Sequence, residues 1–333
     1  MKISGRITFF ILAVALVIAL VGWAALSYTR TVDLGERTVS IVIKSGDSFG
    51  SVVDSIVKRG IVSSKIMLTY PARVYGIDRR LTPGRYDFTG RNSCGSVLRK
   101  LRDADFVRIK VTVPEGSTIW KVASILAARL EVDSGQVVNL NHDTVLLAHL
   151  GLPCLEGYLF PETYFFPWGF GIEEVVGEMV AMFHAKTESV WPDSLPHGLS
   201  LDEIVTVASI VEAETSRKGE HHLVASVYIN RLRKGMKLDA DPMVIYGLGG
   251  LDRPLNRRDL KKDTPYNTYL NKGLPPTPIN SPGLKSIRAA LDPEVTDYLY
   301  FVADDSGGHQ FSRTNAEHNR AIRRIQNARR QSN

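Results

Sequence analysis

An acidic residue lies near the end of a strongly apolar stretch, LDEIVTVASIVEAET at 201–215. Ser200, with Glu203 three residues later, forms a capping box, which predicts that a helix begins here. At about 100° per residue, one face of this helix carries an apolar stripe made of Ile204, Val207, Ala208 and Val211. The next turn brings Glu214 to the edge of that stripe, where an apolar side chain is expected.

A carboxyl group on a buried face is costly unless it is neutral or well paired. Because loss of solvent raises a carboxyl pKa, Glu214 could carry a proton at neutral pH and act as the general acid that glycosidic cleavage requires. The alternative is that Glu214 lies at a frayed helix end and pairs with Arg217, Lys218 or Arg231. Glu212 points about 100° away from the stripe, so we expect it to be more exposed to solvent.

Two later segments carry side chains that suit a sugar. A second helix is predicted from about 219 to 234 and carries Asn230. Four prolines stiffen the segment 266–283, which presents Tyr266, Asn267, Tyr269 and Asn280 at little entropic cost. Aromatic rings stack on the apolar faces of sugars, and amides match their polar edges. The segment therefore suits a carbohydrate, although a proline-rich surface connection would have the same composition.

Composition argues against several classes of function. The 333 residues are 44% hydrophobic and 23% charged, which is typical of a globular chain of about two domains. Lys and Arg number 41 against 35 Asp and Glu, an excess too small to indicate nucleic-acid binding. Cys94 and Cys154 could form one bond but no disulfide framework. The eight histidines are scattered, so we expect no metal site.

The N-terminal segment is a candidate membrane anchor. No charged residue occurs from Ile7 to Thr29, and about 20 apolar residues span a bilayer core. Lys2 and Arg6 precede this segment, so the positive-inside rule places 1–6 in the cytoplasm and the chain after Arg30 outside. A cleaved signal peptide is the alternative, although its apolar region is usually only about 7–15 residues long. The sequence thus predicts a single-pass protein of the cytoplasmic membrane.

The exported part combines strand and helix patterns, which predicts an α+β fold. A strand at 39–44 and a helix at 49–57 have the same layout as a strand at 108–113 and a helix at 119–126. This is either a weak internal repeat or a chance similarity of two amphipathic units. We expect a membrane anchor at 7–29, a small α/β subdomain at 38–105, a second strand–helix unit with a connection at 106–150, and a catalytic domain at 151–333.

Six blocks of sequence follow one another behind the N-terminal segment. They are EGYLFPETY at 156–164, ASIVEAET at 208–215, VASVYINRL at 224–232, DPMVIYG at 241–247, PYNTYLNKGLPPTPINSPG at 265–283 and LYFVADDSGGHQFSRTNAEHN at 299–319. In this order they resemble the endolytic murein transglycosylases, the YceG-like or MltG family. The resemblance covers nearly the whole exported chain.

The resemblance implies a periplasmic enzyme that uses neither a metal nor a cofactor. Such an enzyme cuts peptidoglycan glycan strands internally between MurNAc and GlcNAc and leaves 1,6-anhydro-MurNAc ends. The essential glutamate of the family falls on Glu214, which the helix pattern also selects, while Glu162 and Glu212 are candidates for a supporting acid.

Further expectations follow from the same resemblance. The subdomain at 38–105 would be LysM-like, and the partners would be glycan strands and peptidoglycan synthases whose nascent product the enzyme terminates. A peptidoglycan-binding scaffold protein without catalytic activity is the alternative. An ordinary glycosidase, which would need a second carboxylate, is a third reading.

Overall fold

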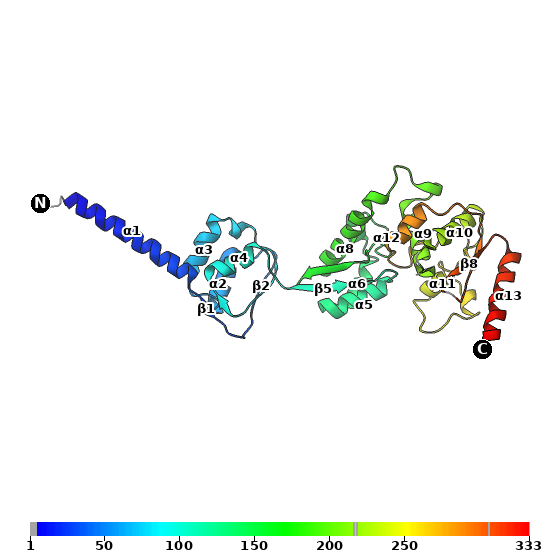
Figure 1. Cartoon of the computed structure of the whole chain (residues 1–333), viewed down its shortest axis with the longest axis horizontal. Coiled ribbons are helices and arrows are strands. Elements are labelled where there is room, and N and C mark those ends of the chain that lie inside the picture. The colour runs from blue at the N-terminus through cyan, green and yellow to red at the C-terminus, as the bar shows by residue number, and fades with distance from the viewer. Residues whose placement is uncertain (1–4, 216, 218, 306, 333) are drawn as a thin grey trace. The chain divides into compact units, whose positions relative to one another are not determined.

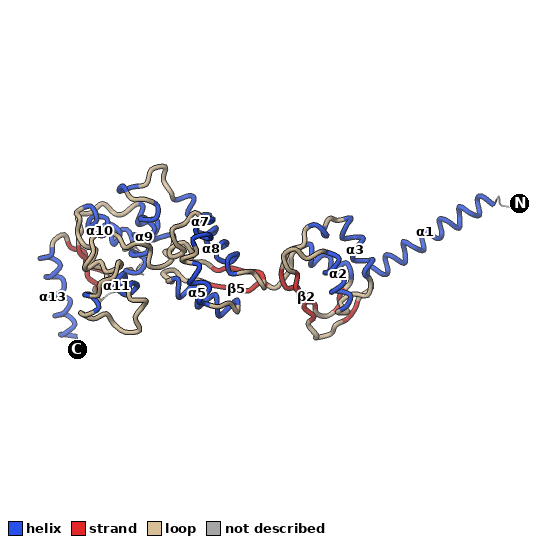
Figure 2. The backbone as a smooth tube through the Cα atoms, turned by 180° about the vertical axis from the view of Figure 1, so that it is seen from behind, coloured by secondary structure: helices blue, strands red, loops and turns tan. Residues whose placement is uncertain are grey.

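The computed structural model of the chain describes residues 5–215, 217, 219–305 and 307–332. Its contacts divide the chain into two compact units. Unit 1 comprises the chain up to residue 110 together with 165–170, and unit 2 comprises 111–164 and the chain from 171 onward. Helices predominate and the strands are short (Figure 2), so the expected mixture of helix and sheet is confirmed.

The first helix of unit 1 is α1, Gly5–Thr29. Its segment Leu12–Thr29 has a mean hydropathy of 2.1, and none of that segment is buried in the structure. By length and composition this helix can cross a membrane, a property that a signal sequence near an N-terminus shares.

Two antiparallel strand pairs and three helices form the rest of unit 1 (Figure 1). Strand β2, Val39–Ile43, pairs with β3, Gly84–Phe88, and the short strand β1, Val32–Asp33, pairs with β4, Arg91–Asn92. The helices are α2 at Phe49–Lys58, α3 at Lys65–Val74 and α4 at Cys94–Arg102. The predicted helix at 49–57 is therefore confirmed.

The core of unit 1 lies between the β2–β3 pair and these helices. Alternate residues of β2 are buried, as the period of two for a half-buried strand requires. Val53, Ile56 and Leu68 have no exposed surface, and Tyr28 at the end of α1 packs against the same core. Helix α1 also contacts α3 and α4, so its C-terminal end is part of this unit.

Strand β5, Arg108–Thr112, pairs with β6, Thr163–Pro167. The predicted strand and helix at 108–126 are present, but β5 pairs with β6 whereas β2 pairs with β3. From residue 111 onward, the expected connection at 106–150 packs within unit 2. The helices of this part are α5 at Ile119–Leu130, α6 at Ser134–Leu140, α7 at Thr144–Leu150 and α8 at Ile172–Thr187.

Helix α9, Leu201–Glu214, is the most enclosed helix of the C-terminal part of unit 2. The predicted capping box is confirmed, since Ser200 N–H donates to Glu203 Oε2 at 2.8 Å and Glu203 N–H donates to Ser200 Oγ at 3.3 Å. All residues from 204 to 211 are buried, not only one stripe. The reason is that α10 at His221–Arg233, α11 at Asp241–Gly247 and α12 at Leu284–Leu291 all contact α9.

The last elements are a hairpin and a helix. Strand β7, Tyr300–Ala303, pairs antiparallel with β8, His309–Ser312. Helix α13, Asn315–Ser332, follows a second capping box, in which Glu317 N–H donates to Thr314 Oγ1 at 3.2 Å. Helix α13 packs on this hairpin.

Candidate active site

The carboxyl group of Glu214 lies where α9 leaves the core of unit 2. Glu214 is the last residue of the helix and is only partly exposed. Thr215 takes an extended conformation, with φ −141° and ψ 127°, while its N–H still donates to the Val211 carbonyl at 3.2 Å. The end of the helix is therefore well defined at the glutamate, which argues against fraying.

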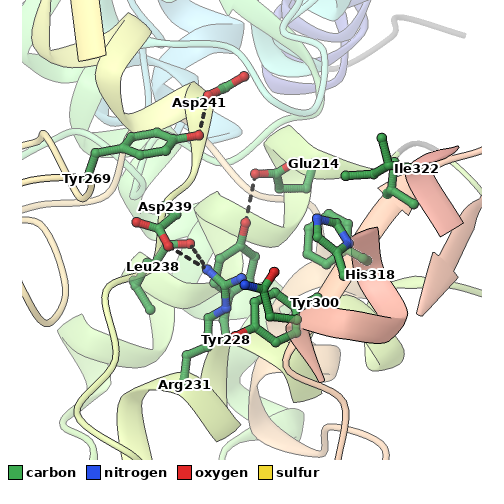
Figure 3. Close-up of a pocket in the computed structure, with 13 residues that line it drawn as sticks. Glu214, Tyr228, Arg231, Leu238, Asp239, Asp241, Tyr269, Tyr300, His318 and Ile322 are labelled. Carbon is green, nitrogen blue, oxygen red and sulfur yellow. Dashed lines mark hydrogen bonds and ion pairs between the residues drawn. The ribbon is translucent and has the colours of Figure 1, made fainter. Parts of the chain in front are cut away.

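A buried tyrosine holds this carboxyl group. The hydroxyl of Tyr228 on α10 donates a hydrogen bond of 2.7 Å to Glu214 Oε1 (Figure 3). Tyr228 is 2% exposed. Burial and the adjacent Glu214 carboxylate raise the Tyr228 pKa well above its ordinary value, so the hydroxyl remains a donor at neutral pH.

A cleft of about 670 Å³ opens beside Glu214, and we call it the glutamate cleft. Residues of α9, α10, α11, α13, β7 and the segment before α11 line it (Figure 3). Its size lies within the range of about 300–1,000 Å³ that is typical of ligand sites. The lining consists of Glu214, Tyr228, Arg231, Leu238, Asp239, Asp241, Tyr269, Tyr300, Phe301, Val302, Asn315, His318 and Ile322.

Arg231 connects several of the elements around the glutamate cleft through hydrogen bonds and an ion pair. Its guanidinium donates to the carbonyls of Leu299 at 2.6 Å and Leu238 at 2.7 Å, and it lies 3.4 Å from the Asp239 carboxylate. The same group lies 5.1 Å from the ring centroid of Tyr300. Arg231 is 9% exposed and thus fixes the start of β7 and the segment before α11 against α10.

Two further carboxylates face this cleft. Asp239 has a φ of +48°, a left-handed conformation that costs energy in a residue with a side chain, and such positions often occur at functional sites. Asp241 begins α11, and its Oδ1 accepts a hydrogen bond of 2.7 Å from the Tyr269 hydroxyl. Figure 3 shows Asp239 beside Arg231 and Asp241 beside Tyr269. The sequence patterns did not select either carboxylate.

Burial raises the pKa of Glu214 above its ordinary value. The Tyr228 hydrogen bond opposes this effect, the negative charge of Asp241 adds to it, and His309 and Arg231 oppose it. The net direction is upward, which favours a protonated carboxyl group closer to neutral pH. Of the pairing partners that the sequence left open, Arg231 has only the last-named effect on this pKa, and Lys218 lies outside the described residues.

Glu212 and Asn280 brace α9 and do not line the glutamate cleft. Glu212 Oε2 accepts from Gly283 N–H at 2.9 Å and from Ser286 Oγ at 2.7 Å. Asn280 Nδ2 donates to the Ser209 carbonyl at 2.8 Å, and Asn280 is 3% exposed. These bonds fasten the proline-rich segment along α9, so they hold the helix that carries the acid.

A close backbone approach fastens the same segment to the block at 156–164. Gly157 has a φ of +89°, and a Cβ atom placed there would lie 2.6 Å from the Pro278 ring. Glycine is therefore required on two grounds, conformation and space. This contact holds the block at 156–164 close to the proline-rich segment.

Asn230 and Asn267 bond the backbone. Asn230 Nδ2 donates to the carbonyls of Thr296 at 2.8 Å and Tyr298 at 3.1 Å. Asn267 has no exposed surface, and its Oδ1 accepts from the Tyr269 N–H at 3.0 Å. Asn267 thereby positions a tyrosine of the glutamate cleft without facing the cleft itself.

The remaining two candidates lie elsewhere in unit 2. Tyr266 hydrogen-bonds Thr277 at 2.8 Å, and its ring centroid lies 4.9 Å from that of Tyr246. The Glu162 carboxylate lies 3.0 Å from Lys186 Nζ, and this contact together with the Thr163 N–H lowers its pKa. Of the residues selected from sequence, Glu214 and Tyr269 line the glutamate cleft.

The sequence patterns did not select several residues of the glutamate cleft, because these residues come together only in the folded protein. Tyr228 and Arg231 lie in the block VASVYINRL at a spacing of three, which places both on one helix face, but nothing in that spacing points to Glu214. The Asp-Ala-Asp stretch at 239–241 places two acidic residues close together in the sequence, and this pattern could have indicated a site. Among the described residues, no cluster of three or more His, Cys, Asp or Glu side chains could hold a metal ion.

The two cysteines are separate buried thiols. Cys94 belongs to unit 1 and Cys154 to unit 2, and neither forms a disulfide in the structure. Burial raises both thiol pKa values, that of Cys154 to about 12. Neither residue lines the glutamate cleft.

Comparison with known proteins identifies the family to which the chain belongs. Residues 41–324 match the model of the YceG-like family. An endolytic murein transglycosylase of Bacillus subtilis (strain 168) is 31% identical over 304 residues, covering 86% of this chain and 84% of the relative. One from Streptococcus pneumoniae is 27% identical, and the match covers 86% of this chain but only 58% of that relative.

A solved structure agrees with the sequence comparison. The crystal structure of a yceG-like protein from Listeria monocytogenes has a TM-score of 0.59 and 29% sequence identity to this chain. The match covers 86% of this chain and all of the Listeria chain. The chain therefore belongs to the YceG-like family, and the two relatives compared above carry the name endolytic murein transglycosylase.

Proposed function

We propose that this protein is a lytic transglycosylase that cuts peptidoglycan glycan strands internally, between MurNAc and GlcNAc, and leaves 1,6-anhydro-MurNAc ends. The observation that carries the proposal is the Glu214 carboxyl group, which lies in the glutamate cleft with a raised pKa and one hydrogen bond from Tyr228. The relatives named endolytic murein transglycosylase support the same substrate.

In the proposed first step, protonated Glu214 donates its proton to the glycosidic oxygen as the bond from this oxygen to MurNAc C1 breaks. The leaving sugar departs with a neutral hydroxyl group, and C1 takes on oxocarbenium-like positive charge. Glu214 is then a carboxylate, and the Tyr228 hydroxyl stabilises its new charge. The carboxylates of Asp239 and Asp241 in the same cleft are suited to stabilise the positive sugar.

In the second step, the Glu214 carboxylate removes the proton of the MurNAc 6-hydroxyl while O6 bonds to C1. This closes the 1,6-anhydro ring, consumes no water and returns Glu214 to its protonated form. Glu214 therefore serves first as acid and then as base, and the bonds and protons of the two steps balance without a metal or cofactor.

Hydrolysis is the second candidate, and the observation that favours it is the pair of carboxylates Asp239 and Asp241. A second carboxylate is what glycosidases use to activate water or to form a covalent intermediate. Asp241 is close enough to Glu214 to raise its pKa. If water takes the place of the 6-hydroxyl, the product has an ordinary reducing end.

The test is product analysis by mass spectrometry, with the full chain acting on purified, uncrosslinked glycan strands in water labelled with ¹⁸O. We expect wild type to give internal cuts with anhydro ends that contain no label. Labelled reducing ends would show hydrolysis, and the absence of any cut with intact strand binding would show a scaffold protein.

Glu214→Gln identifies the acid in the same assay. Because general acid catalysis contributes about 10²–10⁴-fold, the variant should lose nearly all anhydro product while it remains folded. Glu173→Gln, at an exposed position in the first turn of α8, is the matched control and should retain activity. Full activity of Glu214→Gln would overturn the assignment.

The location proposed for this activity is the outer face of the cytoplasmic membrane, with α1 as a single-pass anchor and residues 1–6 in the cytoplasm. We further propose that the subdomain at 38–105 is a LysM-like module that binds wall glycan and that the enzyme shortens nascent strands beside a peptidoglycan synthase. Protease protection of residues 1–6, but not of the chain after Arg30, in inverted membrane vesicles would contradict the topology.

A further inference from the structure

Helix α3 of unit 1 presents an apolar stripe to the outside of the molecule. Ile66 is 56% exposed, Tyr70 67% and Val74 79%. These residues are four apart, so they follow one another along one face of the helix. We call them the α3 stripe.

The opposite face of the same helix is also apolar. Leu68 and Ala72 have no exposed surface and belong to the core of unit 1. At about 100° per residue, they lie roughly opposite the α3 stripe. A surface helix normally turns polar residues outward, so a second apolar face indicates that something covers it.

The α3 stripe lies beside the end of the candidate membrane helix. Helix α3 contacts α1 (Figure 1), and Tyr28 at the end of α1 lines a small cleft with Tyr75, which directly follows α3 and is 73% exposed. Aromatic residues with a polar tip are enriched at the level of lipid headgroups. The surface next to α3 is therefore continuous with the place where α1 would leave a bilayer.

Arginines lie on α3, in the segment after it, which also contains Asp78, and at the cleft beside Tyr75. Arg73 lies about 20° from Ile66 around the α3 axis and is exposed. Arg79 and Arg80 follow α3, and Arg99 borders the cleft that Tyr28 and Tyr75 share. Arg102 lines the same cleft, although Asp103 pairs with it at 2.8 Å. An apolar face bordered by arginines is typical of helices that lie in the interface of an anionic bilayer.

We propose that the α3 stripe rests in the headgroup layer of an anionic phospholipid bilayer, beside the point where α1 leaves it. This inference rests on the proposed anchoring by α1. In this arrangement Ile66, Tyr70 and Val74 enter the boundary of the acyl chains, and Arg73, Arg79 and Arg99 face lipid phosphates. Unit 1 is then held against the membrane by a second contact besides its anchor.

The test uses the full chain in liposomes that contain phosphatidylglycerol, with an environment-sensitive fluorophore on a single introduced cysteine. Tyr70→Cys reports on the α3 stripe, and Leu20→Cys reports on the middle of α1. Ser45→Cys is the matched control, because Ser45 is exposed in the turn after β2 and belongs to neither α1 nor α3. Wild-type protein gives the labelling background, which burial of Cys94 and Cys154 keeps low.

We expect the label at position 70 to shift to shorter emission wavelengths and to be quenched by lipids that are spin-labelled near the headgroup. The label at 45 should show neither effect, and the label at 20 should be quenched by lipids that are labelled deep in the acyl chains. Adding Ile66→Ser and Val74→Ser should abolish the quenching at 70, and vesicles of phosphatidylcholine alone should reduce it. Unchanged cleavage of soluble glycan shows that each variant is folded.

A water-like label at 70 with a lipid-quenched label at 20 would overturn the inference and leave the anchor intact. If the label at 20 is not quenched either, the proposed anchoring fails and the inference falls with it. A shift at 70 that depends on the protein-to-lipid ratio and shows no lipid quenching would mean that a second copy of the chain covers the stripe, which also overturns it.

Discussion

The Tyr228 hydroxyl donates to Glu214 Oε1 across 2.7 Å, and this contact joins the end of α9 to the middle of α10. It places a buried donor against the one candidate acid that sequence and structure both select. The bond favours the charged form of Glu214, whereas burial favours the neutral form. The balance between these two effects sets the pH range in which the carboxyl group can donate a proton.

Tyr228→Phe removes the hydrogen bond and leaves the ring in place. Because that bond lowers the Glu214 pKa, its loss should raise the pKa further. Glu214 then stays protonated to higher pH, so the descending limb of the rate–pH profile should move to higher pH. The maximal rate should fall, because the charge left on Glu214 after proton transfer is less stabilised. Initial rates of anhydro product formation between about pH 4 and pH 9 measure both effects.

Tyr298→Phe is the control for this substitution, since Tyr298 precedes β7 and does not line the glutamate cleft. Its rate–pH profile should match that of wild type. A Tyr228→Phe profile whose descending limb stays in place or moves to lower pH would contradict the role given to the hydrogen bond.

Asp241→Asn should change the Glu214 pKa in the direction opposite to Tyr228→Phe. The negative charge of Asp241 raises the Glu214 pKa, so its removal should lower that pKa. The descending limb should therefore move to lower pH, and less acid remains protonated at neutral pH. Rate–pH profiles of the variant and of Asp252→Asn, an exposed position outside the glutamate cleft, make the comparison.

The same variant separates the two chemical candidates. If Asp241 activates water, Asp241→Asn should remove labelled reducing ends and spare anhydro ends in ¹⁸O water. If the 6-hydroxyl is the nucleophile, anhydro ends remain the product of both proteins, with only the pH dependence changed. A shift of the profile to higher pH would show that the electrostatic coupling is misassigned.

The local parts of this structure could be predicted from sequence because local rules determine them. Ser200 and Glu203 define the start of α9, and the helical period brings Glu214 to the apolar side. The hairpin of β7 and β8 likewise follows from strand patterns on either side of a glycine-containing turn. Capping, periodicity and turns act within a few residues, so one sequence suffices to detect them.

The partners of Glu214 could not be predicted, because they come from distant parts of the chain. Tyr228 reaches the carboxyl group only after α10 packs on α9, and Asp241 only after α11 packs there too. Asn267 and Asn280 were selected as amides that suit a sugar, but both are buried and bond the protein's own backbone. An amide satisfies a carbonyl or a sugar equally well, and only the fold decides which one it meets.

Arg231→Lys tests whether the guanidinium holds the walls of the glutamate cleft together. A lysine ammonium cannot reproduce the planar set of bonds to the carbonyls of Leu299 and Leu238. Losing hydrogen bonds to a buried charged group should cost about 2–3 kcal/mol, so the unfolding temperature should fall. Arg288→Lys, at an exposed position on α12, is the control and should leave that temperature unchanged. Equal stability of the two variants would mean that Arg231 is dispensable for the fold.

Glu156→Gln should change how stability depends on pH. Glu156 is 1% exposed, accepts from Ile119 N–H at the start of α5 and from the Tyr246 hydroxyl, and burial raises its pKa to about 7. Its ordinary value is 4.5, so the folded protein holds this proton more tightly than the unfolded chain does. The stabilising effect of that proton is fully present below pH 4.5 and is lost as pH rises to about 7.

The difference between the two pKa values corresponds to about 3 kcal/mol, so wild type should lose about this much stability between pH 4.5 and pH 8 from Glu156 alone. Glutamine is neutral throughout, and its carbonyl can still accept from Ile119 N–H. Glu156→Gln should therefore unfold at a higher temperature than wild type at pH 8 and at a similar temperature at pH 4.5. Glu173→Gln should follow wild type at both values. A wild-type advantage over Glu156→Gln at pH 8 would mean that the charged carboxylate, through its bonds to Ile119 and Tyr246, stabilises α5 and α11 more than its burial costs.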